Sequence, residues 1–223
     1  MIWLYGICDQ PAEALPLPAA GVAGAEPRAV VEGPLTAVVS DHEHDLREPA
    51  AESMIAHARV VEQLAGGDAG GVLPARFGSS LETEQAVHEL LRDRRERFLA
   101  RLACVHGRVE VGVRAMRLGA AEPEHAEAAR SSGRDYLLAK LRERGEAGRL
   151  ADELDRRLTA LSRERRLLLL RQPRELLRAA YLVEPSAVEA VQREVARSEQ
   201  RSDELAVLCT GPWPPYSFVE EER

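Results

Sequence analysis

Cysteine is scarce in this chain of 223 residues, and its positions exclude two kinds of structural support. The three cysteines, Cys8, Cys104 and Cys209, lie far apart in the sequence. No CxxC spacing joins any two of them, so neither a zinc site nor a disulfide framework is indicated. A chain of this length buries about 70% of its unfolded surface and needs no such support. The pattern fits the reducing cytoplasm.

Long apolar runs and excess positive charge are also absent. No stretch of about 18 apolar residues occurs, so we expect no membrane-spanning helix. The first residues carry no basic lead and turn acidic at Asp9, so we expect no signal peptide. The net charge is -7, whereas duplex nucleic acid and anionic membranes attract a positive surface. We therefore predict a globular protein that binds neither nucleic acid nor membrane.

Catalytic motifs are missing as well. The sequence holds no P-loop, no GxGxxG after a strand, no GxSxG and no HExxH. The run Asp41–Asp45 resembles a metal cluster, but it falls in an expected polar loop, where a solvated charged run is the better interpretation. His57 is interpreted as structural and Cys104 as a small core residue. We predict no catalytic residue, no metal site and no cofactor.

The hydrophobic pattern predicts an α+β protein of two domains. The first, residues 1–107, would be an α+β unit. Its expected elements are a strand Ile2–Ile7, a hairpin Ala29–Val39, a helix Glu52–Leu64 with Ile55 facing inward, a strand Gly71–Gly78 and one long helix Thr83–Val105.

The second domain, residues 108–223, is expected to be ferredoxin-like, with the order βαββαβ, long helices packed on one face of the sheet and an extended tail. Its elements are a strand Val109–Ala115, a helix Gly133–Leu161, strands Arg165–Leu170 and Glu175–Val183, a helix Ser186–Arg197 capped by Ser186, and a strand Leu205–Thr210. One helix over residues 165–183 is the alternative, since leucine and arginine favour helices, but Pro173 counts against it.

Aromatic residues make up only 4% of the chain, yet three of them stand within Trp213–Phe218. Three prolines exclude a helix there. The aromatics either pack on their own protein or anchor a partner, and we expect Trp213 to matter more for folding than for binding. Arg76 leaves a similar choice between an anion and a domain carboxylate, of which we favour the carboxylate. The candidate partner-binding or structural residues are Arg76, Phe77, Gly78, Trp213, Pro214, Pro215 and Tyr216.

Short motifs along nearly the whole chain occur in the order typical of one known family. They are Leu4–Ile7, Val38–Ser40, Val72–Gly78, Val109–Val113, Gly133–Leu137, Ala180–Val183 and Gly211–Phe218. Together they resemble the gas vesicle protein GvpF/GvpL family. The Pro-x-Arg-Phe-Gly motif and the closing motif are the most specific of the set.

The resemblance implies a non-enzymatic accessory protein of gas vesicle formation. Gas vesicles are hollow, gas-filled protein shells in prokaryotic cytoplasm. The implied partners are the small hydrophobic shell protein GvpA and other accessory proteins, bound during assembly. The alternative is a small-ligand-binding regulatory or enzymatic ferredoxin-like module, in which Arg76 and residues 41–45 would converge on one pocket.

Overall fold

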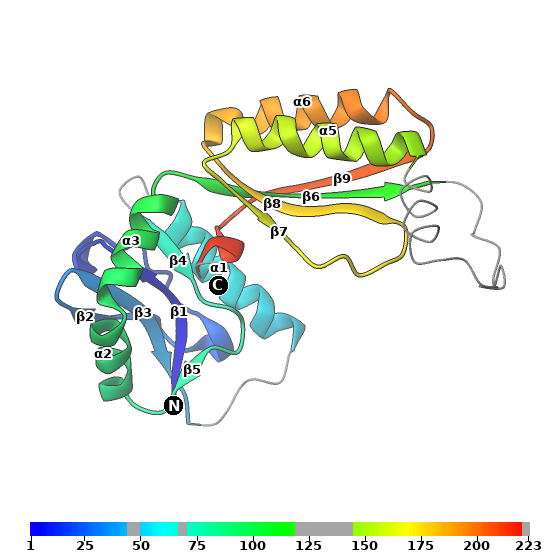
Figure 1. The fold of residues 1–223 in the computed structure, drawn as a ribbon. Coiled ribbons are helices and arrows are strands. Elements are labelled where there is room, and N and C mark those ends of the chain that lie inside the picture. The colour runs from blue at the N-terminus through cyan, green and yellow to red at the C-terminus, as the bar shows by residue number, and fades with distance from the viewer. Residues whose placement is uncertain (44–49, 67–70, 119–144, 220–223) are drawn as a thin grey trace, which may run out of the picture. The chain divides into compact units, whose positions relative to one another are not determined.

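The computed structural model describes residues 1–43, 50–66, 71–118 and 145–219, which fall into two compact units (Figure 1). The first unit contains Met1–Glu110 together with the described residues from Pro212 onward. The second contains Val111–Gly211. Both mix helices with strands, so the α+β class is confirmed. The closing segment groups with the first unit, whereas the sequence pattern assigned it to the second.

The first unit is built on an antiparallel sheet with strand β1 (Ile2–Cys8) in its middle. The strand order is β2-β3-β1-β4, and β5 also pairs with β1. Every residue of β1 is buried, which is typical of a strand covered on both faces. The remaining strands are β2 (Arg28–Glu32), β3 (Leu35–Asp41), β4 (Val72–Pro74) and β5 (Ser80–Leu81).

Three helices of the described residues cover this sheet. Helix α1 (Ala51–Ala65) packs on β1, α2 (Glu84–Asp93) on β2 and β3, and α3 (Arg95–Val105) on β4. Thr83 caps α2 as expected, because its hydroxyl accepts the Ala86 N–H at 3.2 Å. Ile55 was expected to face inward, but it is 52% exposed; the buried face of α1 starts two residues later, at His57.

The single long helix expected over Thr83–Val105 is wrong. The chain breaks at Arg94, where φ is -110° and ψ is 15°. Every residue from Arg92 to Arg97 is charged. This turn therefore offers no apolar side chain that would hold a continuous helix on the sheet.

The second unit has one sheet in the order β7-β8-β6-β9, and Figure 1 shows α5 and α6 on the same face of it. The expected strand pair is confirmed: β7 runs antiparallel to β8, with Arg165 opposite Tyr181. The elements are β6 (Val109–Arg117), α5 (Gly145–Leu161), β7 (Glu164–Leu167), β8 (Glu175–Val183), α6 (Val188–Glu199) and β9 (Leu205–Trp213).

The end of β7 and the start of α6 differ from expectation. Strand β7 ends at Leu167 rather than Leu170. Ser186 does not cap α6, because it lies inside a 3-10 turn begun by Pro185, and Ala187 precedes the helix. The part of the expected helix Gly133–Leu161 before Gly145 lies outside the described residues.

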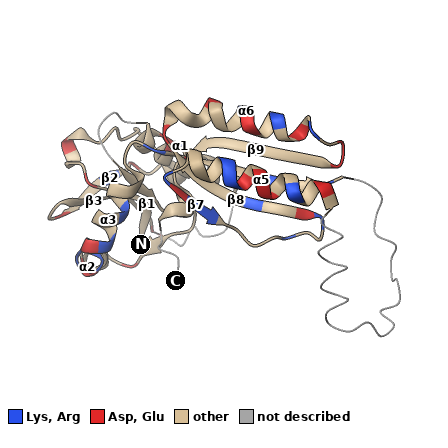
Figure 2. Cartoon of the chain, turned by 45° about the horizontal axis from the view of Figure 1, so that its top comes forward, with Lys and Arg blue, Asp and Glu red and all other residues tan. Residues whose placement is uncertain are grey.

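Helix α5 packs on β8 and has buried leucines along its length, and acidic and basic residues are interspersed along α5 and α6 (Figure 2). Leu154 and Leu158 are fully buried, as their spacing predicted. Arg157 joins the two helices, with Glu153 at 2.6 Å and Glu194 at 2.9 Å. Within the described residues, no helix is long and apolar enough to cross a membrane.

Candidate functional site

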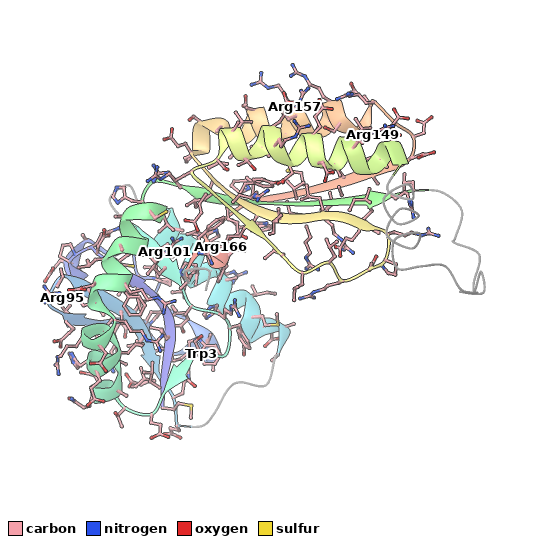
Figure 3. The ribbon with its side chains drawn as sticks, in the orientation of Figure 1. Trp3, Arg95, Arg101, Arg149, Arg157 and Arg166 are labelled. Atoms are coloured by element: carbon pink, nitrogen blue, oxygen red, sulfur yellow. The ribbon has the colours of Figure 1, made fainter. Side chains whose placement is uncertain are left out.

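The first unit holds a buried cluster of aromatic rings around one histidine. Trp3 and Tyr5 lie on β1, His57 on α1, and Phe77 in the turn after β4. The His57 ring stacks on Tyr5 with centroids 5.4 Å apart, and Trp3 meets Phe77 edge to face at 5.0 Å. Trp3 is labelled in Figure 3. These contacts join the strand, the helix and the turn into one packed core.

Hydrogen bonds hold His57 in one neutral tautomer. The Trp3 indole N–H donates to His57 Nδ1 at 3.0 Å. Because Nδ1 accepts, the proton of the neutral ring sits on Nε2, which donates to the Ala75 carbonyl at 2.9 Å. Burial lowers the pKa of His57, and the bond to Ala75 opposes that shift only in part. His57 is structural, as predicted, but it lies in the core.

Tyr5 and its neighbours form a second, connected set of buried hydrogen bonds. The Tyr5 hydroxyl lies 2.9 Å from the Ser40 hydroxyl and accepts the Val22 N–H at 2.8 Å. Ser40 in turn lies 2.8 Å from His42 Nε2. Burial raises the pKa of Tyr5 and lowers that of His42. These polar groups therefore satisfy one another inside the core.

The Pro-x-Arg-Phe-Gly motif forms a tight turn that is hydrogen-bonded to β1. The Ala75 N–H donates to the Tyr5 carbonyl at 2.8 Å, and the Ser79 N–H donates to the Arg76 carbonyl at 3.0 Å. Gly78 has a φ of 89°, which residues with a Cβ atom rarely adopt. The turn directs Phe77 against Trp3 and leaves Arg76 exposed.

The closing segment packs back onto the same core. Phe218 is fully buried, and its carbonyl accepts the Nε–H of Arg101 at 2.9 Å. Arg101, on α3, is labelled in Figure 3. Glu110 accepts both the backbone N–H and the hydroxyl of Ser217, each at 2.7 Å. Tyr216 packs against the cluster that contains Trp3 and Tyr5. Burial, followed by the charges of Glu62 and Glu110, raises the pKa of Tyr216 to about 12.

The structure thus divides the candidate residues by exposure. Phe77 and Tyr216, far apart in sequence, pack against one core cluster, and Pro214 and Pro215 are buried. Trp213 is 48% exposed. The carboxylate partner favoured for Arg76 is not seen: within the described ranges, no carboxylate lies at ion-pair distance from it. Arg76 and Trp213 are the members of the set that reach the surface.

The remaining candidates offer no assembled reactive site. Burial, with a further contribution from Asp9, raises the pKa of the Cys8 thiol to about 12, so this thiol is not a nucleophile at neutral pH. Asp41 pairs with Arg28 at 2.6 Å, while His44 and Asp45 lie outside the described residues. Among the residues that the structure describes, no group of three or more metal-ligating side chains occurs.

Sequence reasoning missed the two residues that anchor the closing segment. Arg101 falls within a helix rich in arginine, and Glu110 occupies a polar position in an alternating strand. Their partners are distant in sequence, at Phe218 and Ser217. Only a sequence signal that links positions far apart in the chain would have indicated that Arg101 and Glu110 contact the closing segment.

The chain is similar to known proteins over almost its whole length. Residues 1–220 match the family model described as gas vesicle synthesis protein GvpL/GvpF. A gas vesicle protein F from Streptomyces sp. (strain CB03234) is 31% identical, over 98% of this chain and 99% of that protein. A gas vesicle protein L from the same strain is 32% identical, over 92% of this chain and 87% of its own length. The crystal structure of GvpF from Microcystis aeruginosa has the same fold, with a TM-score of 0.77 at 16% identity, covering 99% of each chain.

Proposed function

The chain belongs to the GvpL/GvpF family of gas vesicle synthesis proteins, and from this premise we propose that it binds the small hydrophobic shell protein GvpA during vesicle assembly. In this proposal it acts without catalysis, in the cytoplasm and at the growing vesicle, and it also contacts other accessory proteins. The observation that carries the proposal is the match of residues 1–220 to one family of gas vesicle proteins.

The distribution of the candidate residues supports a division of roles. The other five candidates, Phe77, Gly78, Pro214, Pro215 and Tyr216, would stabilise the first unit. Both prolines are buried, Phe77 and Tyr216 pack against the core cluster, and Gly78 shapes the turn. Arg76 and Trp213 would be available to a partner, because they reach the surface. Tryptophan and arginine are enriched among the residues that dominate binding at protein interfaces.

We also interpret the chain as two domains that meet near Gly107, of which the second is ferredoxin-like. The order of its elements and the strand order β7-β8-β6-β9 support this interpretation. The closing segment is the exception, since it packs with the first unit.

Affinity capture tests the proposed binding. Tagged full-length protein is co-expressed with GvpA and the accessory proteins of one gas vesicle gene cluster, and the captured proteins are identified by mass spectrometry. We expect GvpA to be recovered above the level obtained with an unrelated tagged α+β protein. Recovery of none of the gas vesicle proteins would contradict the proposal.

A further inference from the structure

We infer that the leucine loop, residues 167–173 from the last residue of β7 toward β8, binds an extended apolar segment of a partner protein that carries carboxylates at its flank. This assignment rests on the proposed function and names the surface and the chemistry of the bound segment. Every residue from Leu167 to Pro173 is exposed. The run contains four consecutive leucines, Leu167–Leu170.

The four leucines of this run are all exposed, and they follow one another without a break. The exposed fractions are 55% for Leu167, 39% for Leu168, 89% for Leu169 and 50% for Leu170. Single exposed leucines are ordinary on protein surfaces, whereas contiguous exposed apolar residues mark contact sites or aggregation sites. The leucine loop therefore has apolar surface available for a partner.

Hydrogen bonds hold the leucine loop in a defined shape. The buried Glu175 carboxylate accepts the backbone N–H of Arg171 at 2.5 Å and that of Gln172 at 3.3 Å. Its other oxygen lies 2.5 Å from Arg114 Nε, as an ion pair rather than an aligned hydrogen bond. The Leu168 N–H donates to the Arg178 carbonyl at 2.8 Å. A loop held in this way loses little conformational freedom on binding.

The place of the loop in the sheet favours an extended partner. Strand β7 stands at the end of the order β7-β8-β6-β9, so in the described sheet its outer edge has no neighbouring strand. Such an edge offers backbone N–H and C=O groups to an added strand. A partner strand along β7 would place its apolar side chains beside the leucines where β7 ends.

Charge distinguishes among possible occupants. Arg171 and Arg174 adjoin the leucines, and in the described part of the chain neither has a carboxylate at ion-pair distance. They favour a partner with carboxylates. A second copy of this chain, docked through the same loop, would instead bring like charges together. The net charge of -7 disfavours an anionic membrane.

Capture of the co-expressed gas vesicle proteins by full-length variants tests the assignment. The variant Leu169→Asp/Leu170→Asp changes the leucine loop. Leu208→Asp is the matched control, because Leu208 is 58% exposed on β9, at the opposite edge of the same sheet. We expect the loop variant to lower GvpA recovery about tenfold or more, as loss of a binding hot spot does, with the control near wild type. Arg171→Glu is expected to lower recovery as well, and recovery by wild type is expected to fall as salt rises.

The remaining outcomes are distinguishable. Equal recovery by wild type, loop variant and control would overturn the assignment and leave the proposed function standing. If wild-type protein captures no gas vesicle protein, both fail. A further outcome is that wild type self-associates in analytical ultracentrifugation or floats with phosphatidylglycerol vesicles. If only the loop variant loses that behaviour, the leucine loop binds a second copy or a membrane, and the assignment is overturned. Circular dichroism checks the fold of each variant, and Leu169→Ser replaces the double variant if that one unfolds.

Discussion

At the scale of single residues, His57 makes the first unit sensitive to acid. The unfolded pKa of a histidine is about 6.5, and burial lowers the pKa of His57 in the folded chain. At a pH between these two pKa values, the unfolded chain binds more protons at His57 than the folded chain does. The stability that neutral His57 contributes is therefore present above pH 6.5 and is lost as the pH falls toward the folded pKa. We expect the free energy of unfolding to decrease from pH 7 to pH 5, as measured by urea denaturation.

A variant separates this contribution from other titrating groups. His57→Gln cannot be protonated, so its free energy of unfolding should depend less on pH over the same range, whatever its absolute stability. His42 also has a lowered pKa and keeps part of the dependence in the variant. An unchanged slope in His57→Gln would show that protonation of His57 is not coupled to unfolding.

Burial also ranks the aromatic residues of the closing segment. Phe218 is fully buried, whereas Trp213 is 48% exposed. We expect Phe218→Ala to cost about 3–5 kcal/mol of unfolding free energy, in the range for buried aromatic truncations. Trp213→Ala should cost distinctly less. Thermal denaturation of both variants measures this ranking. The expectation from the sequence, that Trp213 matters more for folding than for binding, stays a prediction.

At the scale of elements, the turn after β4 depends on Gly78. Its φ of 89° is unfavourable for any residue with a Cβ atom, and the turn positions both Phe77 and the Ala75 carbonyl that accepts from His57. We expect Gly78→Ala to lower the free energy of unfolding by about 1–2 kcal/mol, the cost of a left-handed conformation. Gly78→Asn should cost less, because asparagine tolerates positive φ better. If wild type and Gly78→Ala are equally stable, the positive φ at residue 78 does not disfavour a residue with a Cβ atom.

The elements also show what could be predicted from the sequence. Alternation and turn residues indicated β1, the β2–β3 hairpin and the β7–β8 pair, because local periodicity determines these structures. The exposure of Ile55 depends on which face of α1 the sheet covers, which local pattern does not report, whereas the charged run around the break at Arg94 is visible in the sequence. The anchoring of Phe218 by Arg101 joins residues far apart in the chain, so no window of sequence contains it.

At the scale of the whole molecule, the chain ends by returning to its first unit. β9 belongs to the sheet of the second unit, yet the residues from Pro212 onward group with the first. Arg101 and Glu110 bind this segment through Phe218 and Ser217. The first unit therefore combines residues that precede the second unit with residues that follow it, so we expect its stability to depend on both segments.

Removal of residues 212–223 tests this dependence. The truncation takes away the buried Phe218 ring, the packing of Tyr216, and the Ser217 donors to Glu110. Loss of these contacts should destabilise the first unit, because its core then gains exposed apolar surface. In hydrogen–deuterium exchange we expect faster exchange of the amides of β1 and β4, with little change in those of β8. Faster exchange in β8 alone would instead mean that the segment stabilises the second unit.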